Sequence, residues 1–155
     1  MANPSQSLSR DIAAEPARVW SVLTDLERVP EIMSGVSGIE RLDDGPFRLG
    51  TSWRETRSAV GRDGIHERTV TELQALGLIR VEESDGTTRS ATTYKLEALH
   101  PGTRLTISHE DEPGDEAGTL AKVAMKVMAP VEHQRAKRSL TSHMDDIATA
   151  AESRD

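Results

Sequence analysis

The stretch "GTSWRETR" (residues 50–57) places an acid and a base beside a tryptophan. Successive side chains of a strand point to opposite faces, so Trp53, Glu55 and Arg57 share one face. Tryptophan favours burial, and its two charged neighbours would follow it inward. An inward carboxylate or guanidinium can orient the polar end of a ligand or move a proton. It can equally pair with other groups, such as Arg10, or with water, because an unpaired buried charge is costly.

His109 is the other candidate for acid–base chemistry, because a neutral imidazole exchanges protons near pH 7. A single strand histidine is more often structural, so both roles stay open. Glu55 and His109 are the two candidate catalytic residues. In the predicted strands, some further polar residues alternate in step with the apolar ones, so their side chains point to the same side of the sheet. These are Arg10, Glu83 and Thr92.

Cofactor and metal chemistry have no sequence signature here. The chain has no cysteine, and its five histidines show no i, i+4 pair. The acidic segment "EDEPGDE" (110–116) lacks the spacing of a calcium loop. No glycine pattern marks a phosphate or dinucleotide site. We therefore expect neither a metal nor a cofactor.

The composition describes an ordinary globular protein. Its 155 residues are 35% hydrophobic and 29% charged, which fits one domain over residues 1–155. Aromatic residues are only 3%, which is compatible with a hollow interior. A net charge of −7 argues against general nucleic-acid binding. Without a signal peptide or an apolar run of about 18–20 residues, we expect a cytoplasmic protein that does not insert into membranes. The oligomeric state is not determined.

The elements that position these residues follow from hydrophobic periodicity. Residues 7–12 alternate as a first strand, Pro16 opens a helix, and Pro30 marks a second short helix around 28–34. Turn residues then separate six further strands, at 36–42, 51–58, 65–74, 78–84, 88–99 and 103–111. Neither face of the 65–74 strand is clearly apolar. The C-terminal part is helical, with Pro130 either kinking one helix or starting a new one, so whether 118–129 continue the C-terminal helix stays open.

This order predicts an α+β helix-grip fold. A curved antiparallel sheet of about seven strands would wrap around a long C-terminal helix, with two short helices between the first two strands. The long helix would cover the concave face of the sheet, which cannot bury itself alone. Spaces of this kind, of roughly 300–1,000 Å³, bind small molecules.

Several stretches carry a resemblance to a known family. They are "IAAEPARVWSVLTDLERVPEIMSGV" (12–36), "GPFRLGTSWRETR" (45–57), "TVTEL" (69–73), "YKLEALHPGTRLTIS" (94–108) and "MDDIATAAE" (144–152). The chain resembles the START-like helix-grip superfamily, also called SRPBCC, and within it the polyketide cyclase/dehydrase-like group. The resemblance implies a deep cavity for an apolar ligand and does not name that ligand.

Three functions are compatible with this reasoning. The protein could bind or carry an apolar small molecule such as a lipid, isoprenoid or polyketide. It could be a cyclase, aromatase or dehydratase that uses acid–base groups of the cavity. It could also be a protein-interaction domain. The residues expected to line the ligand site are Trp53, Glu55, Arg57, Tyr94, Leu96, Ile107, His109, Met125, Met128 and Met144.

Overall fold

A computed structural model describes residues 6–59, 62–84, 88–113 and 137–153. Its main feature is a curved seven-stranded antiparallel sheet in the order β1-β7-β6-β5-β4-β3-β2. The strands are β1 (Gln6–Ile12), β2 (Val36–Arg41), β3 (Ser52–Ala59), β4 (Arg62–Gln74), β5 (Leu78–Ser84), β6 (Thr88–Ala98) and β7 (Thr103–Pro113). Strands β2 to β7 form a meander, and β1 pairs with β7 at the edge. The predicted set of seven strands is confirmed.

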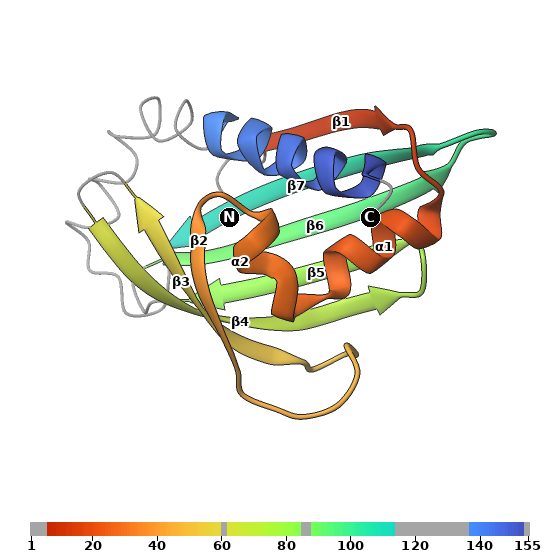
Figure 1. Ribbon diagram of the computed structural model, residues 1–155. Coiled ribbons are helices and arrows are strands. Elements are labelled where there is room, and N and C mark those ends of the chain that lie inside the picture. The colour runs from red at the N-terminus through yellow and green to blue at the C-terminus, as the bar shows by residue number, and fades with distance from the viewer. Residues whose placement is uncertain (1–5, 60–61, 85–87, 114–136, 154–155) are drawn as a thin grey trace.

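Short helices follow the first strand, as predicted. Helix α1 (Pro16–Thr24) begins at its proline, which suits the first helical turn because that turn needs no N–H donor from it. The predicted second helix consists of a 3-10 turn, η1 (Leu26–Arg28), followed directly by α2 (Val29–Ile32). The C-terminal helix is described over residues 137–152. Figure 1 shows it lying across the same face of the sheet as α1 and α2.

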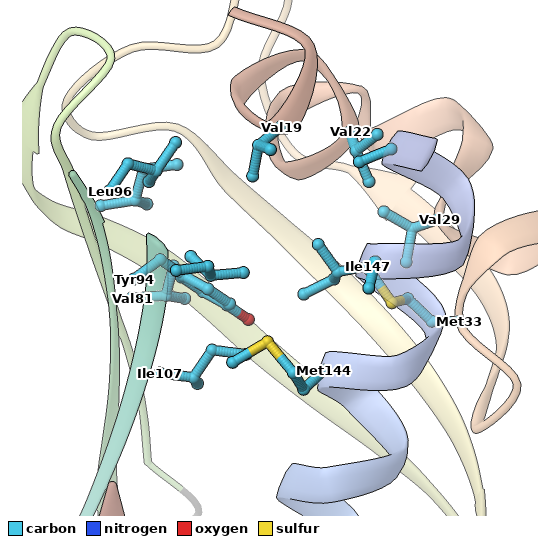
Figure 2. Packing of buried hydrophobic residues seen from close by; sticks show 14 of the residues in the cluster. Val19, Val22, Val29, Met33, Val81, Tyr94, Leu96, Ile107, Met144 and Ile147 are labelled. Carbon is cyan, nitrogen blue, oxygen red and sulfur yellow. The ribbon is translucent and has the colours of Figure 1, made fainter. Parts of the chain in front are cut away.

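The core lies between the concave face and these helices. Leu140, Met144 and Ile147 recur at helical spacing and are buried, so the C-terminal helix presents one apolar stripe to the sheet. Figure 2 shows Ile147 beside Val29 and Met33, and Met144 opposite Ile107 of β7. Burying a side chain of this size stabilises the fold by about 1.5–3 kcal/mol. This packing fixes the helix over the sheet.

The structure of β4 shows why neither of its faces is clearly apolar in the sequence. Its pairing with β5 shifts register between Val70 and Glu72, which marks a β-bulge. Before the bulge, Arg68 and Val70 are buried and Glu67 is exposed. A bulge inserts one extra residue and changes the alternation of faces. No single period-two pattern therefore spans the strand.

Glycine fixes the start of β3, the strand that carries Trp53 and Glu55. Gly50 has φ +90°, a conformation that side chains disfavour, and its N–H donates to Val70 O over 3.0 Å. The next residue, Thr51, accepts a hydrogen bond on Oγ1 from Arg48 N. These contacts set the phase with which β3 enters the sheet.

Candidate ligand-binding cavity

A cavity of about 330 Å³ lies between the sheet and the C-terminal helix. Its volume falls within the range expected from the sequence. One group of lining residues is apolar and comes from the short helices and their connections, the start of β2, the β2–β3 connection and β5: Leu23, Leu26, Val29, Met33, Val36, Phe47, Ile79 and Val81. The other group is polar and comes mainly from the strands: Glu55, Arg57, Arg68, Glu83, Thr92 and His109. The cavity therefore combines a largely apolar lining with a small set of charged side chains.

The residues predicted from the sequence fall into three groups. Five line the cavity: Trp53, Glu55, Arg57, Tyr94 and His109. Three others are buried in the core without lining it: Leu96, Ile107 and Met144. Other core side chains fill the space in front of them: Ile107 and Met144, for example, face each other across the core (Figure 2). Met125 and Met128 lie outside the described residues, as does the segment 118–129.

Glu55 is the most buried carboxylate of the cavity, at 4% exposure. It accepts hydrogen bonds from Arg57 Nε at 2.6 Å and from Trp53 Nε1 at 3.3 Å. Burial alone would raise its pKa, but the charges of Arg68 and Arg57 outweigh that effect and lower the pKa of Glu55 to about 2. Glu55 is therefore an anion throughout the neutral range and carries no proton to donate.

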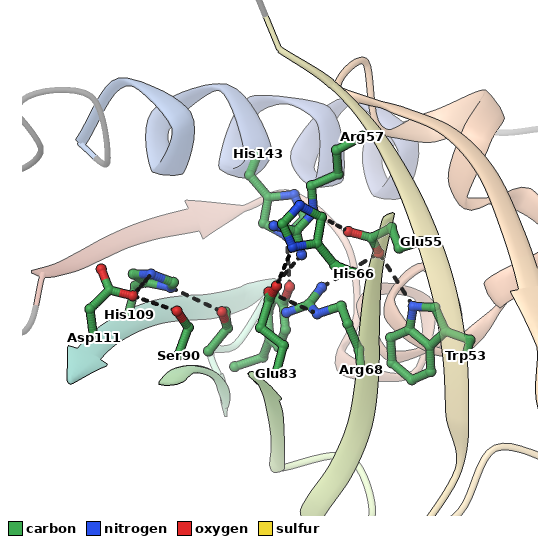
Figure 3. A network of polar contacts seen from close by, with 12 residues as sticks. Trp53, Glu55, Arg57, His66, Arg68, Glu83, Ser90, His109, Asp111 and His143 are labelled. Atoms are coloured by element: carbon green, nitrogen blue, oxygen red, sulfur yellow. Dashed lines mark hydrogen bonds and ion pairs between the residues drawn. The ribbon is translucent and has the colours of Figure 1, made fainter. Parts of the chain in front are cut away.

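Glu83 of β5 completes a cluster of alternating charge, shown in Figure 3. Its carboxylate lies 2.7 Å from Arg57 Nη2 and 2.8 Å from His66 Nδ1. Burial raises the pKa of Glu83, and the charges of Arg68 and Arg57 more than reverse that and lower it. Arg57 bridges Glu55 and Glu83, so the charged groups of β3 and β5 hold each other in place.

Arg68 of β4 is the member of the cluster that the sequence did not reveal. It is 8% exposed, lines the cavity and lies over the ring of Trp53, with 5.9 Å between its Cζ and the ring centroid. Its nitrogens lie 3.6 Å from Glu55 and 3.6 Å from Glu83. The bulge in β4 hid its inward direction, because the alternation that would have shown it is broken two residues later.

A tyrosine and a histidine join the sheet to the C-terminal helix inside the cavity. Tyr94 Oη and His143 Nε2 are 2.7 Å apart, and their ring centroids are 5.7 Å apart. Burial, with the nearby charge of Arg68, lowers the pKa of His143 to about 4, and burial raises the pKa of Tyr94. Both side chains are therefore uncharged at pH 7. His143 was also missed, although it follows Leu140 by three residues on the apolar stripe of the helix.

His109 occupies a separate polar group beside the cavity (Figure 3). Its Nδ1 lies 3.1 Å from Thr92 Oγ1, and its Nε2 lies 3.0 Å from Asp111 Oδ1. Ser90 Oγ donates to the same carboxylate oxygen. Burial raises the pKa of Asp111, but the hydrogen bonds from His109 and Ser90 lower it below its usual range. His109 is thus oriented between a hydroxyl group and a carboxylate.

Arg10 does not pair with Glu55, contrary to one expectation from strand phase. It bonds instead to Asp145 of the C-terminal helix, near the surface. Strand β1 lies at the edge of the sheet, far from β3 in the strand order, so its side chain meets the helix before it reaches the cavity. Among the described residues, no three metal-ligating side chains gather at one place. The same part of the chain contains no helix of the length and apolarity that a bilayer crossing requires.

Comparison with protein families identifies the chain. The family model described as polyketide cyclase/dehydrase and lipid transport matches residues 4–150. The chain belongs to this family. As a member of the polyketide cyclase/dehydrase and lipid transport family, it has the START-like helix-grip fold predicted from its sequence. No curated protein sequence matches it significantly.

Solved structures share the fold of this family member at low sequence identity. The Zhui aromatase/cyclase from Streptomyces sp. R1128 is 15% identical, with a TM-score of 0.74 over 96% of this chain and 93% of that one. The protein TTHA0849 from Thermus thermophilus is 18% identical, with a TM-score of 0.74 over 96% and 97%. A START superfamily protein from Mycobacterium smegmatis is 17% identical, with a TM-score of 0.68 over 96% and 94%. At these identities the likeness concerns the fold alone.

Proposed function

We propose that this protein binds or carries an apolar small molecule in the cavity between the sheet and the C-terminal helix. The observation that carries the proposal is a cavity with many apolar lining residues and a small set of charged ones. Small-molecule sites are lined mainly by apolar groups, with a few polar groups that fix orientation. The lipid transport activity in the family description agrees with this role.

The apolar part of the ligand would lie against α1, η1 and α2, whose inward residues include Leu26, Val29 and Met33. Its polar end would face the cluster of Glu55, Arg57, Arg68 and Glu83, which we call the charged cluster. Charged partners already hold the two glutamates, so ligand binding does not have to assemble them. A preformed site of this kind lowers the free-energy cost of ordering groups on binding.

A second candidate is a cyclase, aromatase or dehydratase activity, which the arrangement of His109 favours. An imidazole held by Asp111 at the wall of a ligand cavity has the form of an oriented general base. Glu55 is less suited to this role because its two arginine neighbours keep it ionised and engaged. An enzyme built on this cavity would therefore depend on His109 rather than on Glu55.

The binding proposal is tested with the neutral fluorescent probe N-phenyl-1-naphthylamine and with retinol, alongside native mass spectrometry of the purified protein. We expect probe fluorescence to rise on binding and the Tm to increase with ligand concentration. At one hundred times Kd the stabilisation is about 2.7 kcal/mol, or roughly 5–10 °C for a chain of this size. Absence of binding for both probes, with no co-purified molecule, would overturn the proposal.

A further inference from the structure

A hydroxyl group, an imidazole and a carboxylate form a chain at the wall of the cavity. Thr92 Oγ1 lies 3.1 Å from His109 Nδ1, and His109 Nε2 lies 3.0 Å from Asp111 Oδ1. Thr92 and His109 are paired across β6 and β7, and Asp111 follows His109 by two residues, so the three side chains share one face of the sheet. Figure 3 shows His109 and Asp111 beside Ser90, apart from the charged cluster.

The carboxylate fixes the direction of these hydrogen bonds. Burial raises the pKa of Asp111, but hydrogen bonds from His109 and Ser90 lower it overall, so Asp111 is ionised at pH 7 and can only accept. His109 Nε2 therefore donates to Asp111, which leaves a lone pair on Nδ1 of the neutral ring. The Thr92 hydroxyl donates to that lone pair. A hydroxyl group held by a base that a carboxylate orients is the arrangement of an activated nucleophile.

The hydroxyl end of this chain is the end that borders the cavity. Thr92 and His109 line it, whereas Ser90 and Asp111 do not. Val81, an apolar lining residue, is paired with Thr92 across β5 and β6. An apolar acyl chain held among the lining residues would thus have its carbonyl carbon within reach of the Thr92 hydroxyl.

The position of Thr92 in the sheet limits which acyl compounds can react. Thr92 is paired with Val81 on one side and with His109 on the other, so its backbone N–H belongs to the sheet and not to an oxyanion hole. The loss of one oxyanion donor costs about 10²–10³-fold in the rate of acyl transfer. A good leaving group offsets part of this cost. We therefore expect aryl esters and thioesters to react, and alkyl esters and amides to be inert.

We infer that Thr92 is a nucleophile that takes the acyl group from activated esters with apolar acyl chains, with His109 as its general base and Asp111 as the positioning residue of His109. The inference rests on the proposed binding function, because the cavity supplies the site for the acyl chain. It adds a covalent acyl-transfer activity that neither candidate under the proposed function includes.

The reaction needs no group beyond the ester and water. Thr92 Oγ1 bonds to the acyl carbon while its proton passes to His109 Nδ1, and the tetrahedral intermediate then expels the aryloxide or thiolate, which takes that proton. Water next bonds to the acyl carbon of the Thr92 ester and gives a proton to His109 Nδ1. The bond to Oγ1 breaks, Oγ1 regains the proton, and the carboxylic acid leaves. Each cycle consumes one ester and one water.

The experiment mixes the protein with 4-nitrophenyl hexanoate or 4-nitrophenyl acetate and follows the release of 4-nitrophenolate. We expect a burst of about one equivalent per chain, and peptide mass spectrometry of the acid-quenched protein should place the acyl group on Thr92. The hexanoate should react about tenfold faster than the acetate, since its longer chain meets the apolar lining. Excess N-phenyl-1-naphthylamine should suppress the hexanoate burst by occupying the same cavity.

Variants assign the reaction to the chain of three residues. Thr92→Val keeps the side-chain shape without the hydroxyl and should slow the burst about 100-fold, whereas Thr92→Ser should still be acylated at this position. Asp111→Asn should slow acylation at least about tenfold, with the half-saturating ester concentration within about twofold of wild type. Thr93→Val is the matched control, because Thr93 is the next residue of β6 and faces the opposite side of the sheet. It should leave the burst unchanged.

The outcomes separate this inference from the proposed function. If the dye binds but the acyl group is found on His109, on a surface lysine or nowhere, the inference fails alone. A burst that persists in Thr92→Val also overturns it. If Thr92→Val does not fold, Thr92→Ser and the mapped acyl position decide. If the dye does not bind and the hexanoate reacts no faster than the acetate, the proposed function fails and the apolar substrate class falls with it.

Discussion

Trp53, Glu55 and Arg57 share the inward face of β3, and the last two can be buried there because neighbouring side chains compensate their charges. Glu55 is buried as an anion between Arg57 and Arg68, and Glu83 is the second carboxylate that Arg57 binds. Glu55, Arg57 and Glu83 therefore have the charged partners that a purely structural role requires. Arg68 is the exception, since its guanidinium lies 3.6 Å from each of the two glutamates and its buried Nε has no hydrogen-bond partner among the described residues.

Glu55→Gln should destabilise the protein strongly and change its acid sensitivity. The pKa of Glu55 is about 2 in the folded protein, against an ordinary value of 4.5 in the unfolded chain. Its contribution to stability is present above about pH 5 and is lost as pH falls through 4.5 toward 2, because the unfolded chain takes up the proton first. We expect a loss of about 3–5 kcal/mol at pH 7, since two arginines lose a buried partner.

Urea unfolding from pH 7 to pH 2.5 measures this effect. The stability difference between wild type and Glu55→Gln should shrink as pH falls below about 5. Glu40→Gln is the control, because Glu40 is an exposed glutamate paired with Arg54 and should cost less than about 1 kcal/mol. A difference that stays constant over this pH range would show that the glutamate is not held ionised by the cluster.

At the level of elements, strand alternation predicted the inward side of β3 but not that of β4. The alternation in β3 is unbroken, so Trp53 indicated the direction of Glu55 and Arg57. In β4 the bulge after Val70 changes the phase, and the direction of Arg68 follows from its partners on the two neighbouring strands, Trp53 of β3 and Glu83 of β5. His143 could have been found from its helical position, but the Tyr94 that it meets lies 49 residues away and only the fold brings them together.

The connection between α2 and β2 is tied to the C-terminal helix at the edge of the cavity. Both the N–H and the Oγ of Ser34 donate to Asp146 Oδ2, each over 3.0 Å, and both residues line the cavity. Any ligand that passes between these two elements must break these bonds. The strength of this contact then sets how often the path opens.

Asp146→Ala should therefore speed both association and dissociation of N-phenyl-1-naphthylamine by about tenfold, because losing hydrogen bonds to a carboxylate favours the open path by roughly 1.5 kcal/mol. The Kd should stay within about threefold, since both rates change together. Stopped-flow fluorescence measures both rates. Asp145→Ala is the control, because Asp145 neighbours Asp146 but bonds to Arg10 of β1 instead. Equal rates in wild type and Asp146→Ala would show that the ligand enters elsewhere.

For the whole molecule, the fold was more predictable than the cavity wall. Alternating strands, proline-marked helices and turn residues are local signals, and they recovered all seven strands and the helix-grip arrangement. Which of the inward-facing residues line the cavity depends on where the C-terminal helix is separated from the sheet. Leu96 and Ile107 face inward as predicted, yet they pack in the filled part of the interior. Strand alternation indicates the direction of a side chain but not the distance between layers.

A hollow interior makes two equivalent substitutions behave differently. Val70 of β4 and Val81 of β5 are paired across the strands, and both are buried, at 1% and 3% exposure. Val81 lines the cavity and Val70 does not. We expect Val81→Phe to place its ring in the cavity, to leave the unfolding free energy within about 1 kcal/mol of wild type, and to abolish probe binding. Val70→Phe overpacks a filled region and should cost about 1–3 kcal/mol while probe binding remains.

Urea unfolding and N-phenyl-1-naphthylamine titration of the two variants test this directly. Both substitutions add the same atoms to neighbouring positions on one face of the sheet, so a difference between them reports the space available at each position. If Val81→Phe is as destabilising as Val70→Phe, the interior closes around Val81 in solution. If it folds normally and still binds the probe with wild-type affinity, the probe occupies a different part of the molecule from the cavity lined by Val81 and Glu55.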